Sequence, residues 1–395
     1  MKDIKDKIRG CLMAGAAGDA LGYTVEFMTR NEILYRYGND GIRSFDIDAS
    51  GKTLISDDTQ MTLFTANGLL MGITRGCMRG MACSPSYYVQ YAYLDWYYTQ
   101  TGLETGSHEH SYTWLKNLPV MAHRRAPGCT CMDACDNLLR CREVVNNSKG
   151  CGGIMRVAPM ALLAASYESR GNDFFNFKET VEEGSEIARI THKHPLAFLP
   201  SAMLTELLFR IVLADTEYVR DNIGSMVSDT IKTLQIIYPG KFEKDKAYLA
   251  DLTRLALNLA TNKKSDNDNI RTLGEGWVGE EAWAIAVYCA VRHIDSVEEA
   301  LTASVNHDGD SDSTGAVTGN IMGAVYGYGH IRERNIFCPE GKNLEDTLEL
   351  SDIILALADD LHRGCIISEN SKLDTPEEQQ WYGRYYMMQP AGIKQ

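Results

Sequence analysis

The chain has 395 residues, of which 44% are apolar and 23% are charged, and its formal net charge at pH 7 is −14. These values are typical of a globular protein that buries a large core. The negative charge argues against nonspecific binding to nucleic acid or to an anionic membrane surface, because the field of the protein repels phosphate.

We expect neither a signal peptide nor a membrane span from the sequence. Residues 1–7 are mostly polar and no apolar core follows them. The most apolar stretch, residues 196–214, is interrupted by Glu206 and Arg210, so it is not predicted to cross a membrane. Eleven cysteines without a secretory signal favour a reducing compartment, and we expect a cytoplasmic protein.

Helical periodicity is the main structural signal along the chain. Apolar residues recur at three- and four-residue steps, which predicts helices at residues 61–71, 187–190, 196–213, 249–259, 280–291, 317–328 and 350–361. Alternation typical of a strand is nearly absent, and residues 44–48 are the best candidate. The sequence therefore predicts an all-α fold with loops between the helices.

Polar segments and the carboxyl end complete the predicted organisation. Residues 101–110 and 262–269 are polar and are predicted to be loops. A last helix is expected at Pro376, with Thr375 as its cap and a glutamate that closes a capping box. No stretch has the composition of an interdomain linker. We therefore predict one compact domain over residues 1–395, with a helical extension from about residue 366.

Glycines recur along one face of two of the predicted helical segments. Gly15, Gly18 and Gly22 are three and four residues apart, and a second series recurs every fourth residue from Gly315 to Gly327. Each glycine costs about 1 kcal/mol in a helix interior. We expect that the gain in return is close approach of another helix or of a ligand. We expect a central pair of tightly packed helices that present loops at one end.

Two clusters of carboxylates and hydroxyls each run into an apolar, helix-like segment. The first is residues 56–59 (SDDT) and the second is residues 306–315 (NHDGDSDSTG). Carboxylates this close repel one another unless they are protonated, solvated or bound to a cation. Oxygen donors alone suit magnesium, manganese or calcium better than zinc. Two distant segments are thus predicted to close on one divalent-metal site, which can be binuclear.

Three alternatives compete with this hypothesis. The spacing of Asp308, Asp310 and Asp312 opens an EF-hand calcium loop, but such a loop requires Gly and Glu where this chain has Ser313 and Gly319. The EF-hand is therefore excluded. A second alternative is that Asp312 or Ser313 only caps a helix while its neighbours are solvated.

The third alternative is a structural zinc site. Its candidate ligands are Cys129, Cys131, Cys135 and Cys141. Their spacing matches no paired CxxC pattern and no histidine pair follows them, which disfavours zinc.

Seven short motifs in order give the chain a family resemblance. They are GAAGDALG at residues 15–22 followed by Glu26, SDDTQM at 56–61, RAPG at 125–128, GGIMRVAP at 152–159, THKHP at 191–195, GEGW with EEA at 274–282, and DSDS at 310–313. Together they resemble the ADP-ribosylglycohydrolases, the family that includes ADP-ribosylarginine hydrolases and the dinitrogenase reductase-activating glycohydrolase. The resemblance covers about residues 10 to 329.

This resemblance implies an all-α domain with two magnesium or manganese ions at one end of its central helices. The implied metal shell is Ser56, Asp57, Asp58, Asp310, Asp312 and Ser313. The family often has Thr at the two serine positions, and serine keeps the hydroxyl that ligation needs.

The implied reaction can be reasoned from the chemistry of such a site. Two ions about 3.5–4 Å apart hold adjacent ribose hydroxyls and activate a water, and a nearby carboxylate takes its proton. Asp57, Asp58 and Asp310 are the candidates for that base. Glu26 follows the glycine-rich segment at a position where the family has a mobile loop glutamate, which closes over the metals or aligns the substrate. The alternative is a solvated loop acid.

The substrate would be held by a glycine-rich turn and by side chains near it. The residues expected at the diphosphate are Gly150, Cys151, Gly152 and Gly153, whose backbone amides can bind phosphate as such turns do. The family often has Asn where this chain has Cys151, which leaves backbone amides as the main donors. A double glycine by itself is more often only a turn.

Other candidates have both a functional and a structural interpretation. Trp277 and Tyr326 are possible stacking partners for adenine, although an aromatic residue on a core helix is more often packing. His192 and His194 are interpreted as hydrogen-bonding residues at a helix start, with His192 near the ligand. Arg156 is expected to pair with a buried acid.

The leading hypothesis is a metal-dependent hydrolase that removes ADP-ribose from a modified side chain, with arginine favoured. Its substrate would be an ADP-ribosylated protein or a small ADP-ribosyl adduct. The alternatives are a noncatalytic ADP-ribose or nucleotide-binding module of the same fold, or a hydrolase of another ADP-ribosyl linkage. A two-metal phosphatase or nuclease is disfavoured, because no basic face or phosphate-binding set of Arg and Lys is evident.

Overall fold

Helices dominate the chain, as the periodicity predicts. The structure is a computed structural model that describes residues 3–81, 84–102, 111–368 and 371–389. Within these residues no β-strand forms, and extended segments pair in isolated bridges between Thr53 and Leu348 and between Gly150 and Val278. The predicted all-α fold is confirmed.

The helices of the amino-terminal half are α1 (Ile4–Tyr23), α2 (Arg30–Tyr37), α3 (Asp57–Arg79), α4 (Pro85–Thr101), α5 (Cys129–Leu139), α6 (Ala158–Glu168), α7 (Phe177–Arg189) and α8 (Pro195–Leu213). Short 3₁₀ helices occur at η1 (Leu115–Asn117), η2 (Pro119–Ala122) and η3 (Cys151–Arg156). The helices of the carboxyl-terminal half are α9 (Thr216–Ile237), α10 (Glu243–Ala260), α11 (Asp266–Leu273), α12 (Gly279–Arg292), α13 (Val297–Val305), α14 (Ser311–Tyr326), α15 (Tyr328–Arg334), α16 (Leu344–Thr347), α17 (Ser351–Arg363) and α18 (Pro376–Tyr385).

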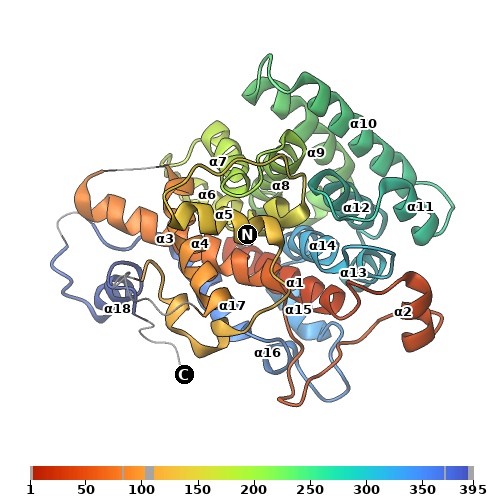
Figure 1. Cartoon of the computed structure of the whole chain (residues 1–395), viewed down its shortest axis with the longest axis horizontal. Coiled ribbons are helices and arrows are strands. Elements are labelled where there is room, and N and C mark those ends of the chain that lie inside the picture. The colour runs from red at the N-terminus through yellow and green to blue at the C-terminus, as the bar shows by residue number, and fades with distance from the viewer. Residues whose placement is uncertain (1–2, 82–83, 103–110, 369–370, 390–395) are drawn as a thin grey trace.

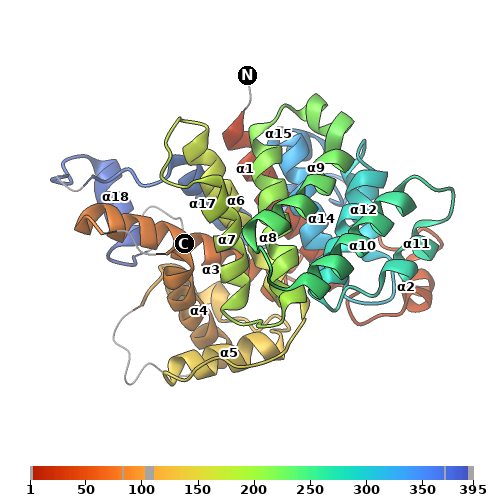
Figure 2. The ribbon, with the colours of Figure 1, turned by 90° about the horizontal axis from the view of Figure 1, so that it is seen from above.

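The glycine-rich helices α1 and α14 form an antiparallel pair, and theirs is the most extensive helix contact in the described structure. A β-carbon on Gly319 would lie 2.0 Å from the carbonyl oxygen of Ala14, and one on Gly18 would lie 2.1 Å from that of Gly315. Only hydrogen therefore fits between the two backbones. The predicted close-packed pair is confirmed, and it lies in the middle of the molecule (Figure 1 and Figure 2).

The other helices surround this pair. Helices α10 and α11 lie at one end of the long axis and α18 at the other (Figure 1 and Figure 2). Helix α8 is long and apolar enough to cross a membrane by length and composition, but 89% of its most apolar window is buried inside the protein. It packs against α6, α7, α9 and α12 as a core helix of this fold.

The strand predicted at residues 44–48 is wrong. The backbone there forms no strand pairing, and the Phe45 amide donates to the carbonyl of Phe337 at 2.9 Å. The Phe45 ring is buried edge-on against Phe337, while Asp46 accepts a hydrogen bond from Tyr37 at 2.8 Å. One buried aromatic residue between polar neighbours thus imitated the alternation of a strand.

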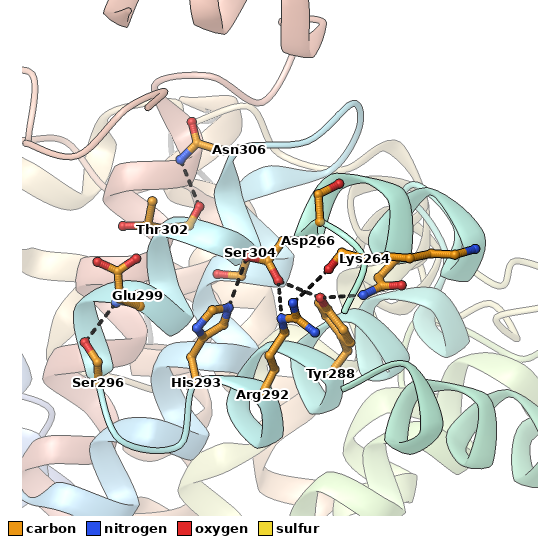
Figure 3. A network of polar contacts seen from close by, with 12 residues as sticks. Lys264, Asp266, Tyr288, Arg292, His293, Ser296, Glu299, Thr302, Ser304 and Asn306 are labelled. Carbon is orange, nitrogen blue, oxygen red and sulfur yellow. Dashed lines mark hydrogen bonds and ion pairs between the residues drawn. The ribbon is translucent and has the colours of Figure 1, made fainter. Parts of the chain in front are cut away.

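The loop predicted at residues 262–269 is wrong over its second half, because α11 begins at Asp266. Figure 3 shows the Asp266 carboxylate facing Tyr288, Arg292 and His293 at the end of α12. Its oxygens lie 2.5 Å from the Tyr288 hydroxyl and 2.9 Å from Arg292 Nε. These contacts anchor a polar segment that carries little apolar signal of its own. Of the loop predicted at residues 101–110, residues 103–110 lie outside the described residues.

The predicted start of the last helix is confirmed. Thr375 and Glu378 form a reciprocal capping box at the start of α18. The helix packs on the body through a hydrogen bond of 2.8 Å from Trp381 Nε1 to Thr74 Oγ1 on α3. A buried ion pair of 2.6 Å between Arg384 and Asp360 joins it to α17.

Candidate functional site

Three helix ends meet at one end of the α1–α14 pair. Helix α3 begins after its cap Ser56, and α14 begins after its cap Asp310. Helix α1 ends beside the start of α14, where a β-carbon on Gly22 would lie 2.1 Å from the carbonyl oxygen of Ser311. The two acidic clusters are therefore brought together at positive helix ends, which favour carboxylates. The turn after α1 carries Glu26 to the same place.

A cavity of about 210 Å³ collects most of the residues that the sequence predicts for the site. The predicted residues on its wall are Glu26, Asp57, Asp58, Gly150, Cys151, Gly152, His192, Trp277, Asp310, Asp312 and Ser313. Two residues of the predicted metal shell and glycine-rich turn are not on this wall. Gly153 faces Ala188 of α7, and the Ser56 hydroxyl accepts the Asp58 amide at 3.1 Å as the cap of α3.

The two clusters are joined directly. The Ser313 hydroxyl donates to Asp58 Oδ2 at 2.8 Å across the two helix ends. The Ser313 amide donates to Oδ1 of Asp312 at 2.8 Å and to Oδ1 of Asp310 at 3.2 Å. Asp57 Oδ2 accepts the Gly128 amide at 3.3 Å. The cap of α14 is Asp310, whereas the capping alternative had named Asp312 or Ser313. The Asp310 carboxylate also lines the shared cavity.

The electrostatics of the site are those of acids held without enough positive charge. Burial raises the pKa of Asp57, Asp58 and Asp310 well above its usual range, and the nearby charge of Asp312 raises it further. The same two causes raise the pKa of Glu26 to about 10. Such a group must bind protons or a cation to remain buried.

The donor set fits a hard divalent cation. Carboxylates and a serine hydroxyl are the ligands that magnesium and manganese prefer. In the described residues, no three Asp, Glu, His or Cys side chains already stand in the arrangement of a metal site. The carboxylates would therefore have to turn toward a bound ion. Glu26 Oε2 is buried on the wall of the same cavity and has no hydrogen-bond partner.

The structure places Glu26 inside the site and excludes the alternative of a solvated acid. Its exposed fraction is 8%, whereas the next residue, Phe27, is 75% exposed. The Phe27 ring stacks on Trp277 with centroids 6.1 Å apart. Trp277 lines the cavity and is also exposed, so this ring pair marks the place where the cavity opens to solvent.

The glycine-rich turn borders the acids as predicted, but its first amides are already used. The Gly150 amide donates to Ser148 Oγ at 3.3 Å, and the Cys151 amide donates to the Trp277 carbonyl at 3.2 Å. The first amides of a helix have no partner within the helix. In the first turn of η3, the Gly152 amide is therefore able to donate to a bound anion. The Cys151 thiol donates to Asp310 Oδ2 at 2.7 Å, which ties this turn to the second acidic cluster.

His192 lies at the cavity and is held in its neutral form. Its Nδ1 is 2.8 Å from Thr191 Oγ1. Burial, with the charge of Arg156 as a second cause, lowers the pKa of His192 to about 3. His194 is separate from the site, because its ring accepts the Leu196 amide at 3.0 Å as the cap of α8.

Arg156 has a structural role, but the partner predicted for it is wrong. The described structure places no carboxylate in an ion pair with it. Instead its guanidinium donates to Thr191 Oγ1 at 2.5 Å and lies 4.4 Å from the centroid of the Tyr93 ring. Tyr326 is also corrected, since its hydroxyl donates to the Ile294 carbonyl and it lines no part of the cavity.

The cysteine group shows no zinc site among the described residues. Cys131 and Cys135 are buried on α5, whereas Cys129 and Cys141 are exposed at opposite ends of it. The Cys131 thiol accepts a hydrogen bond from Arg156 at 3.3 Å. Only Cys131 and Cys135 share the buried face of α5, and the two exposed cysteines lie away from them.

Sequence reasoning missed one buried acid that positions the site. Asp19 of α1 is fully buried and accepts hydrogen bonds from the Ser56 amide at 3.0 Å and the Thr59 amide at 3.0 Å. It therefore binds the first turn of α3 from a neighbouring helix. The signal was present, because an acid inside an Ala/Gly-rich apolar helix requires a buried partner.

Comparison with known proteins agrees with this geometry. The family profile described as ADP-ribosylglycohydrolase matches residues 1–369. The chain is 23% identical over 364 residues to the ADP-ribosyl-[dinitrogen reductase] glycohydrolase of Rhodospirillum rubrum, which covers 90% of this chain and 97% of that protein. It is 25% identical over 239 residues to ADP-ribosylhydrolase ARH3 of Bos taurus, covering 54% of this chain and 62% of that one.

A solved structure shows the same fold. It is described as an ADP-ribosylglycohydrolase-related protein complex, and it superposes with a TM-score of 0.56 at 20% sequence identity. The match covers 92% of this chain and 99% of the other.

Proposed function

Because this chain belongs to the ADP-ribosylglycohydrolase family, whose members hydrolyse glycosidic bonds of ADP-ribose, we propose that it is a metal-dependent enzyme that releases ADP-ribose from modified arginine side chains. The observation that carries the proposal is the cavity in which Glu26 and four aspartates from two distant clusters meet a glycine-rich turn. Retention of all these acids favours an enzyme over a noncatalytic ADP-ribose-binding module.

The metal part of the proposal rests on the donor set. Asp57, Asp58, Asp310, Asp312 and the Ser313 hydroxyl would hold two magnesium or manganese ions, with Ser56 supporting them as the cap of α3. When bound, such ions orient ribose hydroxyls and lower the pKa of a water molecule. The carboxylates supply the negative potential that favours an oxocarbenium-like transition state.

Other residues of the chain would bind and orient the substrate. Amides of the first turn of η3 would bind the diphosphate, and the neutral His192 would donate or accept one hydrogen bond beside it. Glu26 would align the reacting bond, since its free carboxylate oxygen lies on the cavity wall. One of Asp57, Asp58 and Asp310 would take the proton from the water.

The choice of arginine has two supports, one of them at the mouth of the cavity. A guanidinium stacks well on aromatic faces, and Trp277 and Phe27 stand there. A cationic side chain is also favoured by the net charge of −14 that the chain carries. We propose an ADP-ribosylated protein or a small ADP-ribosyl adduct as substrate, and a cytoplasmic location.

The test is a panel of ADP-ribosylated peptides of defined linkage, incubated with and without magnesium or manganese, with released ADP-ribose as the readout. We expect release from the arginine-linked peptide only when metal is present. Release only from another linkage would refute the arginine part. A protein that binds ADP-ribose but releases none from any linkage would instead be the noncatalytic module.

The metal site has its own measurement. Asp310→Asn should weaken magnesium binding in titration calorimetry by several kcal/mol, because it leaves buried charge uncompensated. The matched control is Asp308→Asn in the same loop. Asp308 accepts the Arg30 amide at 2.8 Å, lies 3.2 Å from Arg271, and is not on the cavity wall. Equal affinities in the two variants would exclude the two-cluster site.

A further inference from the structure

Asp57, the first residue of α3, is hydrogen-bonded to the loop at residues 125–128. The Asp57 amide donates to the Arg125 carbonyl at 2.9 Å, and its Oδ2 accepts the Gly128 amide at 3.3 Å. Residues 125–128 therefore contact both the backbone and the carboxylate of Asp57. Ala126 and Gly128 also line the cavity. Whatever fixes residues 125–128 fixes this wall of the site.

The Arg125 side chain is fixed by an acid from the far end of the chain. Its guanidinium lies with Nη2 2.7 Å from Glu349 Oε1 and with Nε 3.4 Å from Glu349 Oε2. The two side chains are 14% and 10% exposed, so water screens the pair little. This two-pronged contact restrains the direction of the guanidinium as well as its position.

Glu349 also holds the segment that leads into Asp57. Its Oε2 accepts the Ile55 amide at 3.2 Å, two residues before Asp57. Its own amide donates to the Thr53 carbonyl at 3.0 Å, and the Thr53 amide donates to the Thr347 carbonyl at 2.8 Å. One carboxylate thus connects the backbone before Asp57 with the loop beside it.

Backbone conformation supports the same interpretation. The residues that follow the two partners are both in the left-handed region, Ala126 at φ 52° and Leu350 at φ 60°. Residues with a side chain rarely adopt this conformation, and surrounding contacts must hold it in place. The Arg125–Glu349 pair is the contact that the two loops share.

We propose that Glu349 is a positioning residue that, through Arg125 and the Ile55 amide, sets the place of Asp57 at the metal site. The inference rests on the proposed role of Asp57 as a metal ligand. Glu349 reaches no substrate or metal, because it is not on the cavity wall. It lies beyond every motif that carries the family resemblance.

The test uses the full chain with Glu349→Gln, which keeps the size of the side chain and one acceptor for the Ile55 amide. Hydrogen exchange of the metal-free protein should become faster in peptides covering residues 53–58 and stay unchanged at the start of α14. Magnesium affinity should fall by about 10–100-fold, the usual loss when a ligand's supporting contact is removed. Arg125→Lys should give a smaller loss of magnesium affinity, because lysine keeps the positive charge but cannot make the two-pronged contact with Glu349.

The matched control is Glu345→Gln. Glu345 lies four residues before Glu349, forms an ion pair of 3.1 Å with Arg332 and accepts a hydrogen bond from Tyr328. In the described structure it makes no hydrogen bond or ion pair with residues 53–57 or with Arg125. It should leave both measurements at wild-type values. The proposal is overturned if Glu349→Gln and Arg125→Lys both show the hydrogen exchange and the magnesium affinity of wild type. It is also overturned if the control variant loses as much magnesium affinity as Glu349→Gln. If the wild-type protein binds no magnesium, the proposed metal site fails, and hydrogen exchange alone decides the role of Glu349.

Discussion

At the scale of single residues, the buried acids of this protein differ in what they contact. Asp19 accepts several donors and organises the start of α3, whereas Glu26 keeps one oxygen without a partner. A buried carboxylate whose oxygens all accept hydrogen bonds can stabilise the fold. A buried oxygen without a hydrogen-bond partner destabilises it by its desolvation penalty, and such a penalty is expected at a functional site. Glu26 is therefore the residue at which we expect function and stability to separate.

Glu26→Gln should leave the magnesium affinity of the resting protein nearly unchanged and lower turnover by about 10²–10⁴-fold, as for a lost acid/base or aligning group. ADP-ribose binding should survive, because the amides of η3 are untouched. Calorimetry and single-turnover release of ADP-ribose measure the two effects. A fully active variant would remove Glu26 from the mechanism and leave the enzyme intact.

A pH effect is expected at Asp95, outside the site. Burial raises the pKa of Asp95 to about 6, despite the opposing charge of Lys116 and bonds from the Tyr112 and Thr113 amides. A carboxyl whose folded pKa is raised stabilises the protein below its unfolded pKa, and this stability is lost as pH rises through the folded pKa. Between pH 4 and 7 the loss should be about 2–3 kcal/mol.

Urea unfolding at pH 4, 5, 6 and 7 tests this expectation when wild type is compared with Asp95→Asn. The difference between the two proteins cancels the titration of the acids at the site, which both share. The variant should lose less stability over this range. Parallel pH profiles would show that Asp95 is ionised at its ordinary pKa in the folded protein.

At the scale of elements, the α1–α14 contact determines where the site lies. The facing glycines bring two backbones so close that the ends of both helices are placed without freedom to shift. Helix α1 delivers Asp19 and Glu26, and α14 delivers Asp310 and its neighbours. The glycines therefore affect the site only by fixing the positions of the two helix ends that carry its acids.

Gly319→Ala should destabilise the protein by at least about 1–3 kcal/mol, because the added β-carbon would lie 2.0 Å from a backbone oxygen that cannot move aside. The melting temperature should fall with or without ligand. Gly224→Ala on α9 is the control, since its β-carbon would meet its nearest neighbour at 3.9 Å. Normal melting of Gly319→Ala with loss of ligand binding alone would mean that this face contacts the ligand.

Prediction from the sequence succeeded for elements and residues that a single local pattern indicates, such as apolar periodicity or a cluster of acids. The periodic segments predicted many of the core helices, although not the buried α6, and the two acidic clusters supplied four of the five carboxylates that line the cavity. Helices α2, α4 and α9 were missed, because their buried faces are made by aromatic or scattered residues rather than a regular apolar series. Glu349 and Arg125 could not be paired from sequence, since nothing in a lone acid indicates a partner 224 residues away.

At the scale of the whole molecule, the carboxyl-terminal extension is part of the packed body. Helix α18 bonds to α3 through Trp381 and to α17 through Arg384. The division into a single domain with an extension from about residue 366 stays a prediction. These contacts lie far from the cavity, so the extension should support stability without changing substrate binding.

Arg384→Met should lower the free energy of unfolding by about 3–5 kcal/mol, because it leaves the buried Asp360 carboxylate without its cation. The control is Arg363→Met, which breaks an exposed pair of 3.6 Å with Glu377 between the same two helices. That change should cost less than about 1 kcal/mol. Denaturant titration gives both values, and an equal effect of the two variants would contradict a structural role for the buried pair.

The distance along the chain between the two central helices also matters during synthesis. The Asn320 side chain bonds to the Cys11 carbonyl across 309 residues. At the roughly 5–20 residues per second of a ribosome, the small-residue face of α1 waits about 15–60 s for its partner to emerge. Helix α1 is thus made long before the helix that covers it, and the nascent chain depends on its surroundings to protect that face until then.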